Sequence, residues 1–222
     1  EAGHTVAGYF SPDADIPFKV TIVSRGMAGG FTRSLPVDDR QLQDRSYYEA
    51  MMTMALGGHV SEELTFGEMT TGAHDDIGKV TQIARNMVTQ WGMSDLMGPR
   101  TFGKRQSMVF LGRDISEERD YSEKTAEQID SEVKRLIEEA HVRCKSILTD
   151  KKEVLARLAE RLIEVETLEG EELLKILGPA EGRGNPADGF ASDPSPTSGS
   201  SVKDEPRDTK SSQGKPGLAW GS

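Results

Sequence analysis

The chain has 222 residues, a formal net charge of −10 and a single cysteine. This length is enough for one domain with a buried core, and the acidic balance argues against nucleic-acid binding as the main function. One cysteine excludes an internal disulfide and a cysteine-based zinc cluster. No apolar run approaches the roughly 20 residues that span a bilayer, so we expect this stretch of chain to be soluble by itself.

The composition changes at Gly178-Pro179. Residues 1–178 carry regularly spaced apolar positions, whereas residues 179–222 consist mainly of Gly, Pro, Ser and charged residues. Such a segment buries too little apolar surface to offset the entropy lost on ordering. We therefore predict one folded domain over residues 1–178 and a disordered tail over residues 179–222.

The folded part is predicted to be mainly α-helical, with a small β-hairpin near its start. A helix is expected from Glu1 to about Phe10, ended by Ser11-Pro12-Asp13. Residues 18–23 alternate and are rich in β-formers, which predicts a strand, and residues 31–35 form its expected return strand.

A longer helix is predicted from Ser46 to about Leu64, because Ser46 and Glu49 have the spacing of a capping box. Gly57 and Gly58 lie inside it and each costs roughly 1 kcal/mol relative to alanine. Their missing side chains predict the close approach of another helix.

The remaining periodic segments predict helices at about residues 76–90, 122–148, 154–163 and 171–177. The long apolar stripes of the second and third indicate a C-terminal helical hairpin packed on the rest of the domain. Cys144 lies on one of these stripes, so we predict a buried, reduced thiol.

The first four residues, Glu1-Ala2-Gly3-His4, have the spacing of the last four of His-Glu-x-x-His. In that motif two histidines on one helical face hold Zn²⁺ and the glutamate acts as general base. Glu1 is therefore a candidate catalytic base and His4 a candidate metal ligand, with the other histidine expected immediately before Glu1 in a longer parent protein. Glu-x-x-His also occurs by chance in many helices, and spacing alone favours a surface or core histidine.

A catalytic zinc takes three protein ligands and keeps one open position. The best source of a further ligand is the segment 71–76, where a carboxylate enters a helix. Asp75 and Asp76 could equally cap that helix and complement its dipole, and spacing leaves His74 open as a ligand as well. Of the other histidines, His59 is predicted to be packed or at an interface and His141 to lie on a solvated face.

A series of short segments follows one order along the chain: residues 1–7, 57–64, 66–68, 70–77, 84–94, 110–113 and 166–172. Together they resemble the peptidase domain of FtsH, the membrane-anchored ATP-dependent zinc metalloprotease, over roughly residues 1–178. The resemblance implies a zincin-like metalloprotease fold and a zinc ion held by both histidines of the motif and by Asp76. His59 stands where we expect arginine in many members.

The resemblance also implies what the parent protein contains. We expect N-terminal membrane segments, an ATPase module that uses ATP and Mg²⁺, a homo-hexameric ring, and unfolded or membrane-extracted proteins as substrates. The parent is expected at a bacterial inner membrane with the protease domain on the cytoplasmic side, or at an organelle membrane in a eukaryote. No Gly-rich phosphate loop with Lys-Ser/Thr is present, so no nucleotide site is expected within these 222 residues.

We therefore predict a zinc-dependent endopeptidase domain that binds its substrate along residues 18–24 or along the return strand. By itself the chain is expected to show little activity, because two ligands rarely hold zinc tightly. The alternative is a catalytically inactive homologue that serves as a helical assembly module. A residue other than histidine before Glu1 in the parent would favour that alternative.

Overall fold

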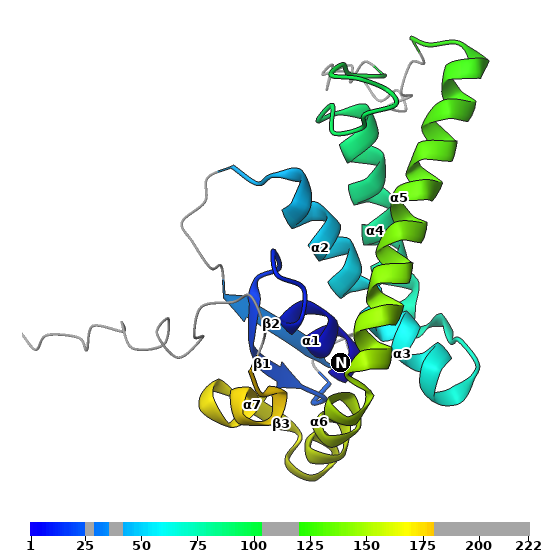
Figure 1. Cartoon of the computed structure of the whole chain (residues 1–222). Coiled ribbons are helices and arrows are strands. Elements are labelled where there is room, and N and C mark those ends of the chain that lie inside the picture. The colour runs from blue at the N-terminus through cyan, green and yellow to red at the C-terminus, as the bar shows by residue number, and fades with distance from the viewer. Residues whose placement is uncertain (25–28, 36–41, 104–119, 180–222) are drawn as a thin grey trace, which may run out of the picture. The chain divides into compact units, whose positions relative to one another are not determined.

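The computed structural model describes residues 1–24, 29–35, 42–103 and 120–179. Helices predominate and one small sheet lies beside the first helix (Figure 1), which confirms the predicted fold class. The elements in chain order are α1 Ala2–Tyr9, β1 Ile16–Thr21, β2 Phe31–Leu35, α2 Arg45–Ala55, α3 Gly57–Phe66, the short 3₁₀ helix η1 Thr71–Ala73, α4 His74–Thr89, α5 Glu123–Asp150, α6 Lys152–Val165, β3 Thr167–Glu169 and α7 Gly170–Leu177.

Two expectations fall outside these residues. The predicted tail at 179–222 is described only at Pro179, and the segment 110–113 of the FtsH resemblance is not described. The domain division therefore stays a prediction. Among the helices that are described, none is long and apolar enough to cross a bilayer.

The sheet has the strand order β2-β1-β3, with both pairings antiparallel. The β1–β2 hairpin, which pairs Thr21 with Phe31, was predicted; β3, which pairs Leu168 with Val20, was not. Three residues are too few to display an alternating pattern. Because β1 is paired on both sides, it offers no free edge there to another chain, whereas no described strand pairs with the outer edge of β2.

The helix predicted over Ser46–Leu64 is divided into α2 and α3 at Leu56. Two adjacent glycines follow Leu56, and their low helix propensity makes this the weakest point of the segment. The predicted cap is also displaced. Asp44, rather than Ser46, is the N-cap of α2, and its carboxylate accepts a hydrogen bond of 2.9 Å from the Tyr47 N–H.

Helices α1 and α3 cross with their backbones in contact. A Cβ atom on Gly3 would lie 2.2 Å from the carbonyl oxygen of Gly57, and a Cβ on Gly57 would lie 2.5 Å from that of Gly3. Both distances are far shorter than any real carbon–oxygen contact. The close helix approach expected from Gly57 and Gly58 is therefore confirmed, and α1 is its partner.

One apolar core joins α1, the sheet and the later helices. Cys144 in α5 is fully buried within it, which confirms the predicted buried thiol, and burial raises its pKa to about 12. The hydroxyl of Tyr9 donates a 2.7 Å hydrogen bond to the carbonyl oxygen of Gly178, so the end of α7 is tied to α1. The largest buried side chains are Tyr9, Met52, Met87, Leu136, Leu148, Leu158, Leu162, Leu168, Leu173 and Leu177.

Candidate metal centre

The imidazole of His4 is oriented by the main chain of α2. Its Nδ1–H donates a hydrogen bond of 3.0 Å to the carbonyl oxygen of Met54. A carbonyl oxygen can only accept, so this contact assigns the proton of a neutral ring to Nδ1. The lone pair on Nε2 is then available to a metal ion, and a main-chain partner of this kind is typical of histidines that bind metals.

Asp76 lies opposite this nitrogen. Its Oδ2 atom is 3.3 Å from Nε2 of His4, although 72 positions separate the two residues in the chain. Asp76 and Asp75 occupy the first turn of α4, where negative charge is favoured, but the N-cap is Ala73, with no side-chain cap hydrogen bond. Neither aspartate is therefore the N-cap of α4. His74 is exposed at the first position of the helix.

The adjacent His4 imidazole, and to a lesser degree Lys79 at 3.1 Å from Oδ1, lower the pKa of Asp76 to about 2 against the opposing effect of partial burial. Asp76 is thus ionised at neutral pH. A carboxylate oxygen and the lone pair of a neutral imidazole both donate electron pairs and would repel at 3.3 Å. A cation held between the two atoms would remove this repulsion.

The spacing of these two donor atoms fits zinc. Two ligand atoms of a tetrahedral zinc ion, with bonds of about 2.0–2.2 Å, lie about 3.3–3.5 Å apart. The observed separation of 3.3 Å matches that range. Within the described parts of the chain no three His, Cys, Asp or Glu side chains are grouped so that they could hold a metal ion. His4 and Asp76 are thus two candidate donors, one fewer than the three protein ligands of a catalytic zinc site.

Glu1 lies at the start of α1, against the start of β2. Its Oε2 atom accepts a hydrogen bond of 3.1 Å from the hydroxyl of Thr32. A Cβ on Gly30 would be 2.8 Å from Cγ of Glu1, so the edge strand passes directly beside the candidate base. The sequence reasoning did not identify Thr32. Alternation along β2 places Thr32 on the face opposite Phe31 and Arg33, which is the signal that could have revealed it.

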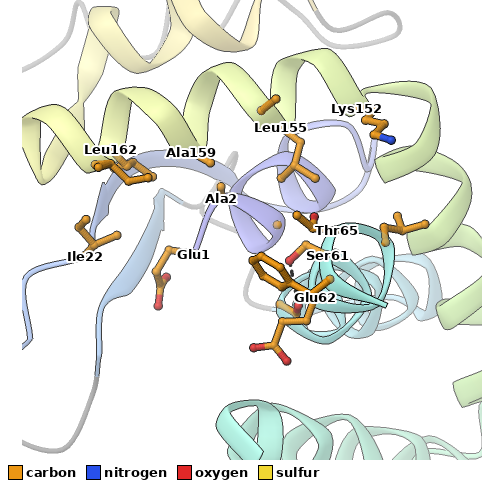
Figure 2. A pocket seen from close by; sticks show the side chains of 16 residues that line it. Glu1, Ala2, Ile22, Ser61, Glu62, Thr65, Lys152, Leu155, Ala159 and Leu162 are labelled. Carbon is orange, nitrogen blue, oxygen red and sulfur yellow. Dashed lines mark hydrogen bonds between the residues drawn. The ribbon is translucent and has the colours of Figure 1, made fainter. Parts of the chain in front are cut away.

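A hollow of about 500 Å³ adjoins Glu1 and is lined mainly by apolar side chains. Figure 2 shows Leu155, Ala159 and Leu162 along one face of α6, turned toward Ala2. Phe66 and Ile163 also line the hollow and are each 75% exposed.

The two other histidines lie where α3 meets α5. The His59 and His141 rings have centroids 6.2 Å apart, so His59 is packed against α5, one of the two predicted alternatives. His141 was predicted to face solvent, but it is only partly exposed and its Nε2 atom lies 3.5 Å from Glu63 of α3. The prediction considered the neighbours of His141 on its own helix and could not include the facing helix.

A small sheet beside a helix bearing Glu1 and His4, with a carboxylate brought in from a second helix, is the arrangement of a metalloprotease. Residues 1–176 match peptidase family M41. The chain belongs to this family.

Curated relatives agree with this assignment. The chain is 50% identical over 177 residues to ATP-dependent zinc metalloprotease FtsH 3 of Symbiobacterium thermophilum, 48% over 184 residues to FtsH of a Synechococcus strain, and 46% over 178 residues to FtsH of Bacillus subtilis. These alignments cover 80–82% of the chain but only 28–29% of each relative. The predicted resemblance to FtsH is confirmed, and the chain spans less than a third of the length of these relatives.

Proposed function

We propose that the chain is the proteolytic part of a longer zinc-dependent endopeptidase, with His4 and Asp76 as metal ligands and Glu1 as general base. The observation that carries this proposal is the 3.3 Å approach of His4 Nε2 to Asp76 Oδ2, with the other imidazole nitrogen bonded to Met54. The word zinc in the names of the relatives supports the choice of metal. The third ligand is expected from a histidine that precedes Glu1 in the longer protein.

The residues of the proposed site have separate roles in peptide-bond hydrolysis. His4 and Asp76 would hold the zinc ion, which supplies Lewis-acid activation of water and of the scissile carbonyl group when bound. The Glu1 carboxylate takes a proton from the attacking water and delivers it to the leaving amine. The Thr32 hydroxyl restricts the rotation of that carboxylate through its 3.1 Å hydrogen bond.

One feature near Glu1 supports an extended protein substrate. The outer edge of β2, which no described strand covers, can pair with the backbone of an extended chain irrespective of its sequence. This edge is consistent with unfolded or membrane-extracted proteins as substrates.

The rest of the longer protein is proposed from the family. The relatives are named ATP-dependent, which supports an ATPase module that would use ATP and Mg²⁺. A homo-hexameric ring, membrane anchoring and a cytoplasmic position of the protease domain complete the proposal. By themselves the 222 residues are expected to be nearly inactive, because they supply only two described ligands. The inactive-homologue alternative is not favoured by the M41 and FtsH matches.

Three substitutions in the longer protein test these roles. Glu1→Gln is expected to retain stoichiometric zinc and to lower the proteolytic rate by about 10²–10⁴-fold, the usual contribution of a general base. Asp76→Ala is expected to lose zinc, whereas Asp75→Ala, the matched change at the neighbouring exposed carboxylate, is expected to keep it. Metal analysis and a casein-degradation assay give the two readouts. Substantial turnover by Glu1→Gln, or zinc loss only in Asp75→Ala, would refute the assignment.

A further inference from the structure

Gly58 lies directly against the metal-binding nitrogen of His4. A Cβ atom on Gly58 would be 2.6 Å from Nε2 of His4, 3.1 Å from Cε1 and 3.5 Å from Cδ2. The ring therefore occupies space that any other residue at this position would fill. Gly58 belongs to α3 and lies outside the Glu-x-x-His segment of α1.

Its neighbour Gly57 faces a different kind of obstacle. A Cβ there would lie 2.5–2.7 Å from main-chain atoms of Gly3 and His4, which cannot move unless the two helices separate. At Gly58 the nearest atoms belong to the end of a side chain, which can rotate. A methyl group at 57 would thus disturb the fold, whereas a methyl group at 58 would displace the imidazole and leave the helix crossing in place.

We propose that Gly58 is a positioning residue for the metal site: its lack of a side chain keeps Nε2 of His4 directed at Asp76. An added Cβ at 2.6 Å must be relieved by about 1 Å to reach an ordinary contact, mostly by rotation of the imidazole. Metal–ligand distances tolerate only about 0.2 Å. The same rotation would break the 3.0 Å hydrogen bond to the Met54 carbonyl oxygen. The zinc part of this inference rests on the proposed function; the placement of the imidazole does not.

The first experiment compares three glycine-to-alanine changes in the longer natural protein, by competitive Zn²⁺ titration and by the visible spectrum of the Co²⁺-substituted form. Gly58→Ala is expected to weaken metal binding by about 10–100-fold, the usual effect of disturbing the groups that orient a ligand. Its melting temperature without metal should stay near that of the wild type. Gly57→Ala should instead lower the melting temperature. Gly78→Ala, in open space on α4, should leave metal binding unchanged and raise the melting temperature only through the higher helix propensity of alanine.

The second experiment uses the metal-free chain of 222 residues and needs no zinc. A long-range ¹H–¹⁵N spectrum of the histidine rings should show His4 of the wild type as the Nδ1–H tautomer bonded to Met54, and Gly58→Ala should lose this signature while Gly78→Ala keeps it. If the wild type binds no zinc, the proposed function fails while this spectrum still tests Gly58. The inference is overturned if Gly58→Ala leaves the His4 signals or the metal affinity unchanged, or if it destabilises the chain as much as Gly57→Ala.

Discussion

The two ends of helix α4 are held in different ways. At its N-terminal end Asp76 meets His4, whose helix is pressed against α3 through glycines with no side chain between the backbones. Just beyond its C-terminal end, Ser94 donates a 2.7 Å hydrogen bond to Glu132 of α5, and Arg135 donates to both oxygens of that carboxylate at 2.8 Å. The N-terminal end of α4 is therefore positioned by close backbone packing at glycines. The C-terminal end is held by hydrogen bonds between polar and charged side chains.

This difference has a physical reason. A backbone contact between glycines has almost no adjustable torsions, so it fixes the distance between α1 and α3 and thereby places His4. Long side chains such as Arg135 can adapt, so they stabilise α5 against α4 without fixing their distance as closely. The contacts at the N-terminal end of α4 thus fix the positions of the candidate site residues. The contacts at its C-terminal end stabilise the fold, and small shifts of those side chains do not affect the candidate site.

The largest effect is expected where a backbone contact is broken. Gly3→Ala would place a Cβ 2.2 Å from the Gly57 carbonyl oxygen and force the two helices apart. We expect the free energy of unfolding to fall by about 3 kcal/mol, the upper part of the usual range for overpacking. Urea denaturation measures this, with Gly78→Ala as the control. A loss below about 1 kcal/mol would show that α1 and α3 are not in tight contact.

A smaller effect is expected at the opposite end, from Glu132→Gln. The Arg135 guanidinium, together with Ser94, lowers the pKa of Glu132 despite its burial at 3% exposure. Stabilisation by the ionised carboxylate is therefore complete above about pH 4.3, the unfolded value, and is lost as the pH falls below it. At pH 7 the variant should lose about 2 kcal/mol, the usual value for hydrogen bonds to charged groups.

The pH dependence separates this ion pair from a packing effect. The difference between wild type and Glu132→Gln should shrink as the pH falls below about 4.3, because the unfolded chain then binds a proton while the folded carboxylate, with its lowered pKa, stays ionised. Urea denaturation between pH 3 and pH 7 measures this, and the His4 ring signals should be unchanged at pH 7. An equal difference at every pH would contradict the electrostatic role of Glu132.

The smallest effect concerns the start of α2, which lies at the same end because Arg45 contacts Asp95 at 2.8 Å. Asp44→Ala removes the N-cap and should cost about 1 kcal/mol. Ser46→Ala, at the position that the sequence pattern favoured as the cap, should cost only a few tenths of a kcal/mol, as is usual for exposed positions without a capping role. Thermal unfolding of the two variants compares them directly, and a larger loss for Ser46→Ala would restore the original assignment.

The sequence pattern was sufficient for elements whose stabilising contacts are local or periodic. The stripes of α4, α5 and α6 and the alternation of β1 predicted those elements within a few residues. It was not sufficient for β3, whose three residues form a strand only because β1 is beside them. It also did not locate the break at Leu56, although the low helix propensity of the two following glycines is visible in the sequence; the contact of Gly57 with Gly3 is visible only in the structure.

The residues of the candidate site also differ in how far the sequence could predict them. Spacing alone related Glu1 to His4, because both lie on one helix. Asp76 was one of the candidates in the segment 71–76, and only the family resemblance selected it, since no local rule connects residues 72 positions apart. Met54 and Thr32 could not be predicted as partners, because their contacts depend on how α2 and β2 are packed against α1.

The pairing of β1 with β3 affects the order in which the protein can be completed during synthesis. Lys19 is paired with Glu169, 150 residues further along the chain. At translation rates of about 5–20 residues per second, the second edge of β1 waits about 8–30 s for its partner to be made. During that interval β1 has only β2 to pair with. The sheet next to Glu1 is therefore finished among the last parts of the domain, so a ribosome-bound chain that ends before β3 lacks the completed sheet.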